Sequence, residues 1–141
     1  MRLSVTTQHG ALVETDVEEI VAPGALGEFG VLPGHVPFLS VLRPGVFVYR
    51  TREGSRSLAV GDGVLQVARA PGNEQTDRIL VLVERALHAR DIDREAAARE
   101  LAALDAEIAR WHKDEPAEYQ ALLGRRAWAA ARVEAAATTA H

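Results

Sequence analysis

The segment 27–39, with the sequence GEFGVLPGHVPFL, places three glycines and two prolines among short apolar runs. Glycine tolerates positive φ and proline fixes φ, so this backbone is predicted to turn repeatedly between extended pieces and to hold one defined shape. Gly24, Gly27 and Gly30 are predicted to shape turns. They do not form a phosphate loop, because a Walker motif ends in Gly-Lys-Ser/Thr and the only lysine in the chain is Lys113.

The composition changes near Arg90, from residues rich in glycine and proline to a stretch dominated by alanine, glutamate, arginine and leucine. The earlier part contains short β-branched runs separated by glycine-containing turns, a pattern typical of a sandwich or barrel. One such run, 18–22, is expected to stop at Pro23-Gly24. The later residues favour helices. We therefore predict a β-sandwich domain over residues 1–87 and an α-helical domain over residues 88–141.

Two amphipathic helices are predicted in the second domain. Asp91 or Asp93 can cap the first helix, and Asp114 can cap the second, where Pro116 fits the first turn. Apolar residues recur at spacings of three and four along both helices. The first stripe comprises Ala97, Leu101, Leu104, Ile108 and Trp111, and the second comprises Tyr119, Leu122, Leu123, Ala127, Ala130 and Val133.

The predicted fold class is α+β, with an N-terminal all-β sandwich, or flattened barrel, followed by a C-terminal antiparallel two-helix hairpin. The short break between the helices favours the antiparallel arrangement. Both stripes contain few large side chains, and an isolated helix of this length is only marginally stable. The hairpin is therefore predicted to be a two-state element that can exchange one docking partner for another.

Few residues point to catalysis. Cysteine is absent, which excludes disulfides, thiolate metal sites and a cysteine nucleophile. His35 has no second histidine or carboxylate at ligand or base spacing, so it is predicted to bond a loop backbone or to line a protein contact. Glu28 and Phe29 offer a charged and an aromatic contact group for another protein. Alternatively, Phe29 enters the core and Glu28 stays solvated.

The second predicted helix is locally basic. Arg125, Arg126 and Arg132 are opposed there mainly by Glu134. Such a cluster is usually a solvated face, but a helix that swings away from its hairpin could use these arginines to clamp an acidic surface.

Three stretches resemble the epsilon subunit of bacterial F-type ATP synthases: 27–35 (GEFGVLPGH), 42–45 (LRPG) and 60–67 (VGDGVLQV). The resemblance covers essentially the whole chain. It implies a non-catalytic rotor subunit of the central stalk, which helps to couple proton translocation to ATP synthesis. The sandwich would bind the gamma subunit and the c-ring. The implied contact candidates are Glu28, Phe29 and His35.

The same resemblance implies that the hairpin inhibits ATP hydrolysis. In that family the helices either fold against the sandwich or extend along gamma to the alpha and beta catalytic subunits. Arg125, Arg126 and Arg132 would then face acidic segments of those subunits.

Some members of the family bind ATP through the motif Ile/Leu-Asp-x-x-Arg-Ala at the start of the first helix. Here residues 92–97 read IDREAA, so Ala96 stands in place of the arginine. Because a guanidinium supplies a bidentate contact that an aliphatic side chain cannot, the resemblance implies at most weak nucleotide binding. Such nucleotide binding would use Ile92, Asp93 and Arg126. No cofactor or metal is expected.

The formal net charge is −4, so the chain lacks the excess of positive charge that is typical of nucleic-acid-binding proteins. The chain has no apolar run of the roughly 18 residues that suggest a membrane span. The resemblance implies a peripheral location on the cytoplasmic face of the bacterial inner membrane, with membrane association only through the complex, and leaves proton or sodium coupling open. The residues themselves leave two other classes open, namely a small β-sandwich enzyme or ligand-binding module and a helical-hairpin adaptor such as a chaperone.

Overall fold

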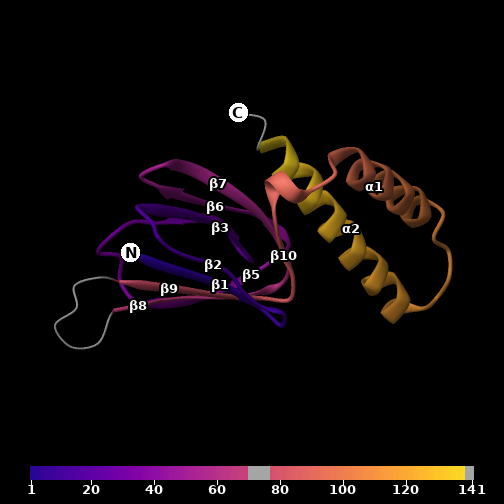
Figure 1. The fold of residues 1–141 in the computed structure, drawn as a ribbon. Helices are drawn as coiled ribbons and strands as arrows, with labels where there is room; N and C mark the ends of the chain where they lie inside the picture. The colour runs from indigo at the N-terminus through magenta and orange to yellow at the C-terminus, as the bar shows by residue number, and fades with distance from the viewer. Residues whose placement is uncertain (70–76, 139–141) are drawn as a thin grey trace.

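The computed structural model describes residues 1–69 and 77–138, which form a β-sandwich followed by two helices (Figure 1). Residues 139–141, the end of the predicted helical domain, lie outside this description. Within the described ranges, ten strands follow the order β10-β7-β6-β3-β5-β8-β9-β1-β2, with β4 paired to β3. The strands are β1 (Arg2–Thr7), β2 (Gly10–Asp16), β3 (Glu19–Gly24), β4 (Gly27–Val31), β5 (Phe38–Leu42), β6 (Gly45–Thr51), β7 (Gly54–Val60), β8 (Gly63–Ala68), β9 (Arg78–Val83) and β10 (Ala86–His88).

One apolar core fills the sandwich, because inward and outward side chains alternate along its strands. On β9, Ile79, Val81 and Val83 are at most 6% exposed, whereas the intervening Leu80 and Leu82 face outward. β1 pairs in parallel with β9, which joins the first strand to the last long strand. The largest fully buried side chains are Phe47, Leu3, Ile20, Leu42, Leu58, Leu65, Ile79, Val5, Val31, Val60 and Val81. The predicted α+β fold, with a sandwich followed by a helical hairpin, is confirmed.

All three glycines predicted to shape turns lie in strands, Gly27 only as the first residue of β4. Gly24 ends β3 and Gly30 lies inside β4, so β3 continues through Pro23 rather than stopping there. A Cβ at Gly24 would come within 2.8 Å of the Phe29 side chain, so this glycine lets the ring pack closely over the backbone. Gly27 does mark a turn, with a φ of 130°.

The helical part comprises the short 3-10 turn η1 (Ala89–Asp91), α1 (Arg94–Ala109) and α2 (Pro116–Thr138). Asp93 is the cap of α1, because its Oδ1 accepts a hydrogen bond from the Ala96 amide at 3.1 Å. α2 starts at Pro116, so the cap position before it belongs to Glu115. The prediction of Asp114 as this cap was wrong by one residue.

α2 lies between α1 and the sandwich (Figure 1), where it contacts β6 and β7 on one side and α1 on the other. Against α1 it buries a cluster of Leu104, Leu122 and Ala129. The cluster between α2 and the sheet consists of Ala59, Ala89, Trp128, Ala131 and Ala135. Both clusters are separate from the sandwich core, so the hairpin is docked on the sandwich rather than fused into it.

The burial of α2 differs from the predicted stripe. Ala127, Ala130 and Val133 are only half-buried, whereas Trp128 is 8% exposed. Alanine occurs on nearly every side of this helix, so residue spacing alone does not define one face. Similarly, Trp111 lies beyond the end of α1, although it packs against the cluster between the helices.

Candidate interaction surfaces

The connection between β4 and β5 is held in one shape by hydrogen bonds. Gly34 has a φ of 84°, and its amide donates to Oδ2 of Asp77 at 3.0 Å. The His35 amide donates to the Leu32 carbonyl at 3.1 Å, and its ring Nδ1 lies in hydrogen-bond contact with the Val36 carbonyl at 2.8 Å. These contacts agree with the predicted turns and with the prediction that His35 bonds a loop backbone.

Phe29 and Glu28 occupy opposite faces of β4. Phe29 is half-buried against the sandwich core, and its ring packs edge-on to Phe38 at a centroid distance of 5.6 Å. The His35 ring adds to this aromatic contact, 4.8 Å from Phe38. Glu28 is exposed. Phe29 thus packs inward and Glu28 is solvated in the isolated chain, while the use of Glu28, Phe29 and His35 as partner contacts stays a prediction.

An apolar surface that sequence reasoning missed lies on the outward face of β5, β8 and β9. Leu39 and Val41 on β5 are 69% and 59% exposed, and Leu80 and Leu82 on β9 are 37% and 44% exposed. Strand register sets them in two rows across β8: Leu39 aligns through the exposed Gln66 with Leu80, and Val41 aligns through Val64 with Leu82. We call this surface the apolar face; it consists of Leu39, Val41, Val64, Leu80 and Leu82.

The apolar face continues into a shallow hollow beside the turn between β3 and β4. The hollow has a volume of about 500 Å³ and is lined by Leu26, Glu28, Phe29 and β5 residues that include Leu39 and Val41. Leu26 is fully exposed, and the neighbouring Ala25 amide donates to the Val41 carbonyl at 2.9 Å. The exposed carboxylate of Glu28 therefore lies at one end of the apolar face.

The sequence did carry a signal for this surface. The run 79–83 is apolar at every position, and 38–42 is nearly so. A strand with one solvated face normally alternates apolar and polar residues, whereas unbroken apolar runs are typical of strands covered on both faces. Here the sandwich core covers one face only, and an exposed apolar patch of this kind is typical of an interaction surface.

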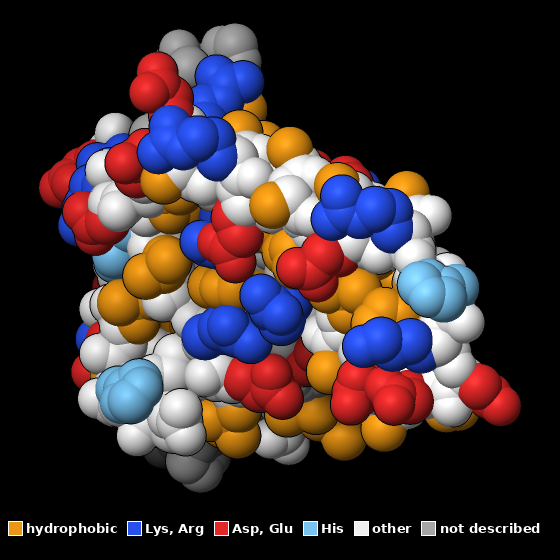
Figure 2. Space-filling view, turned by 90° about the vertical axis from the view of Figure 1, so that its right-hand side faces the viewer, with side chains coloured by type: hydrophobic (Ala, Val, Ile, Leu, Met, Phe, Trp, Pro, Cys, Tyr) orange, Lys and Arg blue, Asp and Glu red, His pale blue; other side chains and the backbone are white. Residues whose placement is uncertain are grey.

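Two of the three arginines proposed as a basic contact are paired within the hairpin. Arg126 Nε donates to Oδ1 of Asp105 at 2.7 Å, and Arg132 Nη2 donates to Oε2 of Glu100. Residues later on α2 thus pair with residues earlier on α1, as expected for antiparallel helices. Figure 2 shows acidic and basic side chains lying against one another on this side of the molecule. Arg125 is exposed.

The three residues considered for nucleotide binding have three different structural roles. Asp93 caps α1, Ile92 packs against the Trp128 cluster, and Arg126 pairs with Asp105. The structure does not bring their side chains into contact with one another, and nucleotide binding through them stays a prediction.

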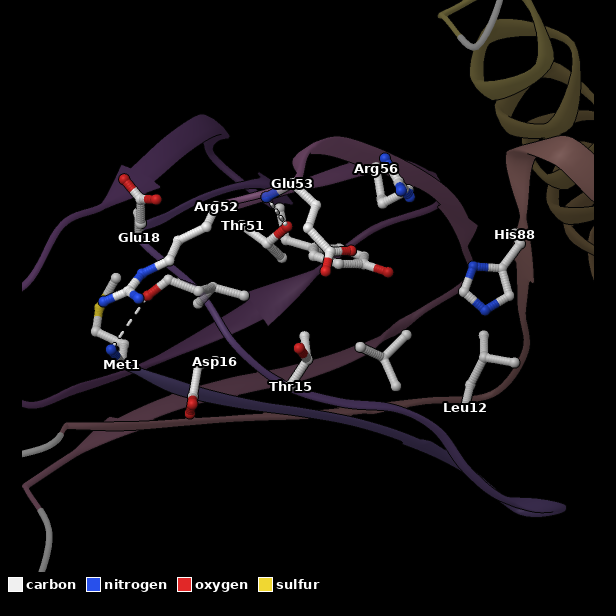
Figure 3. Close-up of a pocket in the computed structure, with 13 residues that line it drawn as sticks. Met1, Leu12, Thr15, Asp16, Glu18, Thr51, Arg52, Glu53, Arg56 and His88 are labelled. Carbon is white, nitrogen blue, oxygen red and sulfur yellow. Dashed lines mark hydrogen bonds between the residues drawn. The ribbon is translucent and has the colours of Figure 1, made fainter.

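A cavity of about 630 Å³ opens between the two layers of the sandwich (Figure 3). In Figure 3, Thr15 and Asp16 of β2 lie opposite Glu53 and Arg56, and His88 closes one end. The complete lining is Met1, Leu12, Val13, Thr15, Asp16, Val17, Glu18, Tyr49, Thr51, Arg52, Glu53, Arg56 and His88.

The cavity does not assemble a nucleophile with a base. Burial lowers the pKa of His88 below 6.5, an effect that Arg90 reinforces and that Asp91 and a backbone hydrogen bond with Leu12 oppose. Burial also raises the pKa of Tyr49 above 10.0. The Thr51 hydroxyl donates to the Gly54 carbonyl at 3.2 Å rather than to His88.

In residues 1–69 and 77–138, no three histidine or carboxylate side chains are placed to hold a metal ion. Over the same residues, neither helix has the apolar length that a bilayer crossing requires.

Known proteins with the same sequence pattern are ATP synthase chains. The family described as ATP synthase, Delta/Epsilon chain, beta-sandwich domain matches residues 1–89. ATP synthase epsilon chain 2 of Syntrophotalea carbinolica is 42% identical over 118 residues, which cover 84% of this chain and 78% of that protein. The ATP synthase epsilon chain of Geotalea uraniireducens is 34% identical over 143 residues, which cover 100% of this chain and 96% of that protein.

A solved structure shares the fold. A chain in the structure of the Euglena gracilis mitochondrial ATP synthase superposes with a TM-score of 0.75 at 20% identity, covering 99% of this chain and 80% of that chain. The observed architecture, a β-sandwich with an appended helical hairpin, is the one that this solved structure shares. The chain belongs to the ATP synthase epsilon chain family, so the family resemblance read from its sequence is confirmed.

Proposed function

We propose that this protein is a non-catalytic rotor subunit of the central stalk of an F-type ATP synthase. Its membership of the epsilon chain family supports this role. The observation on the molecule itself that carries the proposal is the apolar face, which the chain leaves uncovered although β9 is apolar on both sides from Ile79 to Val83. The subunit helps to couple ion translocation to ATP synthesis, and the chain lies peripherally at the cytoplasmic face of the bacterial inner membrane.

The apolar face is the docking surface for the gamma subunit. It lies on β5, β8 and β9, whereas the hairpin occupies β6 and β7, so gamma and the folded hairpin do not compete for one surface. Full burial of each large aliphatic side chain contributes about 1.5–3 kcal/mol, which gives this face enough apolar surface for a stable contact. We further propose that Glu28, at the edge of this face, and His35, in the connection between β4 and β5, meet polar loops of the c-ring.

Replacing Leu82 with lysine is expected to weaken binding to the cognate gamma–c-ring assembly about 10- to 100-fold. Because Leu82 is already partly covered, binding can bury only its exposed 44%, which contributes about 1 kcal/mol. Placing an ammonium group in an apolar contact costs roughly 1 kcal/mol or more in addition, and 1.4 kcal/mol is tenfold in affinity. The thermal stability of the free chain should stay nearly unchanged, because Leu82 is 44% exposed. A titration with labelled gamma–c-ring assembly measures the affinity.

The matched control is Leu87→Lys. Leu87 is 39% exposed on β10, outside the apolar face, so this substitution should leave binding unchanged. Equal affinities for the wild type and Leu82→Lys would exclude the apolar face as the docking surface, and so would an equal loss in both variants.

The hairpin is the inhibitory element. Truncation after Arg90 removes α1 and α2 but keeps every strand of the sandwich. We expect the truncated chain to assemble with a catalytic head that lacks this subunit and to give severalfold faster ATP hydrolysis than the full-length chain. Hydrolysis assays on the two reconstituted complexes test this. Equal rates would remove the inhibitory role, and failure of the truncated chain to bind would show that the sandwich alone does not dock.

A further inference from the structure

Trp128 fixes α2 to the sandwich. It is 8% exposed and packs in a cluster whose other buried members are alanines of α2, β7 and η1. The Arg85 guanidinium, from the turn between β9 and β10, lies 5.1 Å from the centroid of the Trp128 ring. The Arg132 guanidinium, one helical turn further along α2, lies 5.6 Å from it. The indole is thus contacted by one cation from each side of the docking interface.

Arg132 also belongs to the interface between the two helices. Its Nη2 donates to Glu100 on α1, and its side chain is 17% exposed. Its Nε is buried without a hydrogen-bond partner among the described atoms. The position of this guanidinium is therefore set by the Trp128 ring on one side and by the Glu100 carboxylate on the other.

We infer that Arg132 couples the two interfaces of α2, so that separation of α1 from α2 and release of α2 from the sandwich favour each other. When Glu100 moves away, Arg132 loses its charge partner and no longer has a fixed position against Trp128. When Trp128 leaves the sandwich, Arg132 becomes exposed to water, which weakens its pairing with Glu100. The hairpin therefore opens and undocks as one cooperative step.

The second ion pair does not have this property. Arg126 and Asp105 also join α2 to α1, but their side chains are 43% and 48% exposed and neither contacts Trp128. This pair therefore stabilises the packing of α1 against α2 but not the docking of α2 on the sandwich. It provides a control of the same chemistry within the same two helices.

The coupling is a property of the isolated chain, while its consequence for regulation rests on the proposed function. An acidic protein surface that draws Arg132 away from Glu100 would release the hairpin from the sandwich as well. Capture of this one arginine would thus start the change of docking partner.

A double-mutant cycle with Arg85→Gln and Glu100→Gln in the full chain tests the coupling. Hydrogen–deuterium exchange of α2 amides reports hairpin release, and amides of β8 report the integrity of the sandwich in each variant. Each single substitution should increase α2 exchange. The double variant should increase it about fivefold less than the product of the two single effects, which is about 1 kcal/mol of coupling at 1.4 kcal/mol per tenfold.

The control cycle pairs Arg85→Gln with Asp105→Asn, for which the two effects should multiply. Repeating the first cycle in an Arg132→Gln background should likewise remove the coupling. Independent effects of Arg85→Gln and Glu100→Gln would overturn the inference, and so would equal coupling in the two cycles. Since these measurements use the isolated chain, failure of the inference would leave the proposed role in the rotor standing, and failure of that role would leave the coupling intact.

Discussion

Replacing Trp128 with alanine is expected to detach the hairpin from the sandwich while the sandwich stays folded. Removing a buried tryptophan side chain costs about 3–5 kcal/mol. The other buried members of its cluster are alanines, and each methyl-sized group contributes only about 0.8 kcal/mol. Most of the apolar docking energy therefore depends on one side chain. The sandwich core does not include Trp128, so its own packing is unaffected.

Limited proteolysis with trypsin measures this detachment, because α2 carries Arg125, Arg126 and Arg132 as cleavage sites. These sites should be cut much faster in Trp128→Ala than in the wild type, while amides of β8 and β9 keep their slow exchange. Trp111→Ala is the matched control. Trp111 packs between the helices and not against the sheet, so its loss should leave α2 docked. Wild-type cleavage rates in Trp128→Ala would contradict the assignment of this residue as the anchor.

The sequence predicted elements whose cause is local. Leu3 and Val5 alternate with polar neighbours along β1 and are buried in the core, and Asp93 caps α1 because its carboxylate reaches a free first-turn amide. β10 was missed because it has only three residues and gains its strand conformation by pairing with β7. No periodic pattern is long enough to predict such an element.

The errors have a tertiary cause. Gly24 is a glycine because the ring of Phe29 passes over it, a contact that no neighbouring residue reveals. Trp128 did not fit the predicted stripe, because α2 is covered on two sides by different partners and its alanines allow either side to be buried. The apolar face could have been found from the unbroken apolar run 79–83, whereas its alignment with β5 needed the strand order.

Replacing Gly63 with alanine is expected to destabilise the sandwich by about 3 kcal/mol or more, which lowers Tm by roughly 10 °C or more. Gly63 begins β8, between β5 and β9. A Cβ added there would lie 2.0 Å from the carbonyl oxygen of Leu82 and 2.8 Å from Cα of Val83. These are backbone atoms of a paired strand, so they cannot move aside without breaking the hydrogen bonds between β8 and β9.

Gly124→Ala introduces the same methyl group where space is open. A Cβ at Gly124, in α2, meets no atom within 4 Å, and alanine favours a helix over glycine by about 0.5–1 kcal/mol. This variant should therefore be equally stable or slightly more stable than the wild type. Thermal denaturation followed by circular dichroism compares the three proteins. If Gly63→Ala melted within a few degrees of Gly124→Ala, β8 and β9 could not be packed as closely as the structure places them, and the alignment of the apolar face across these strands would be wrong as well.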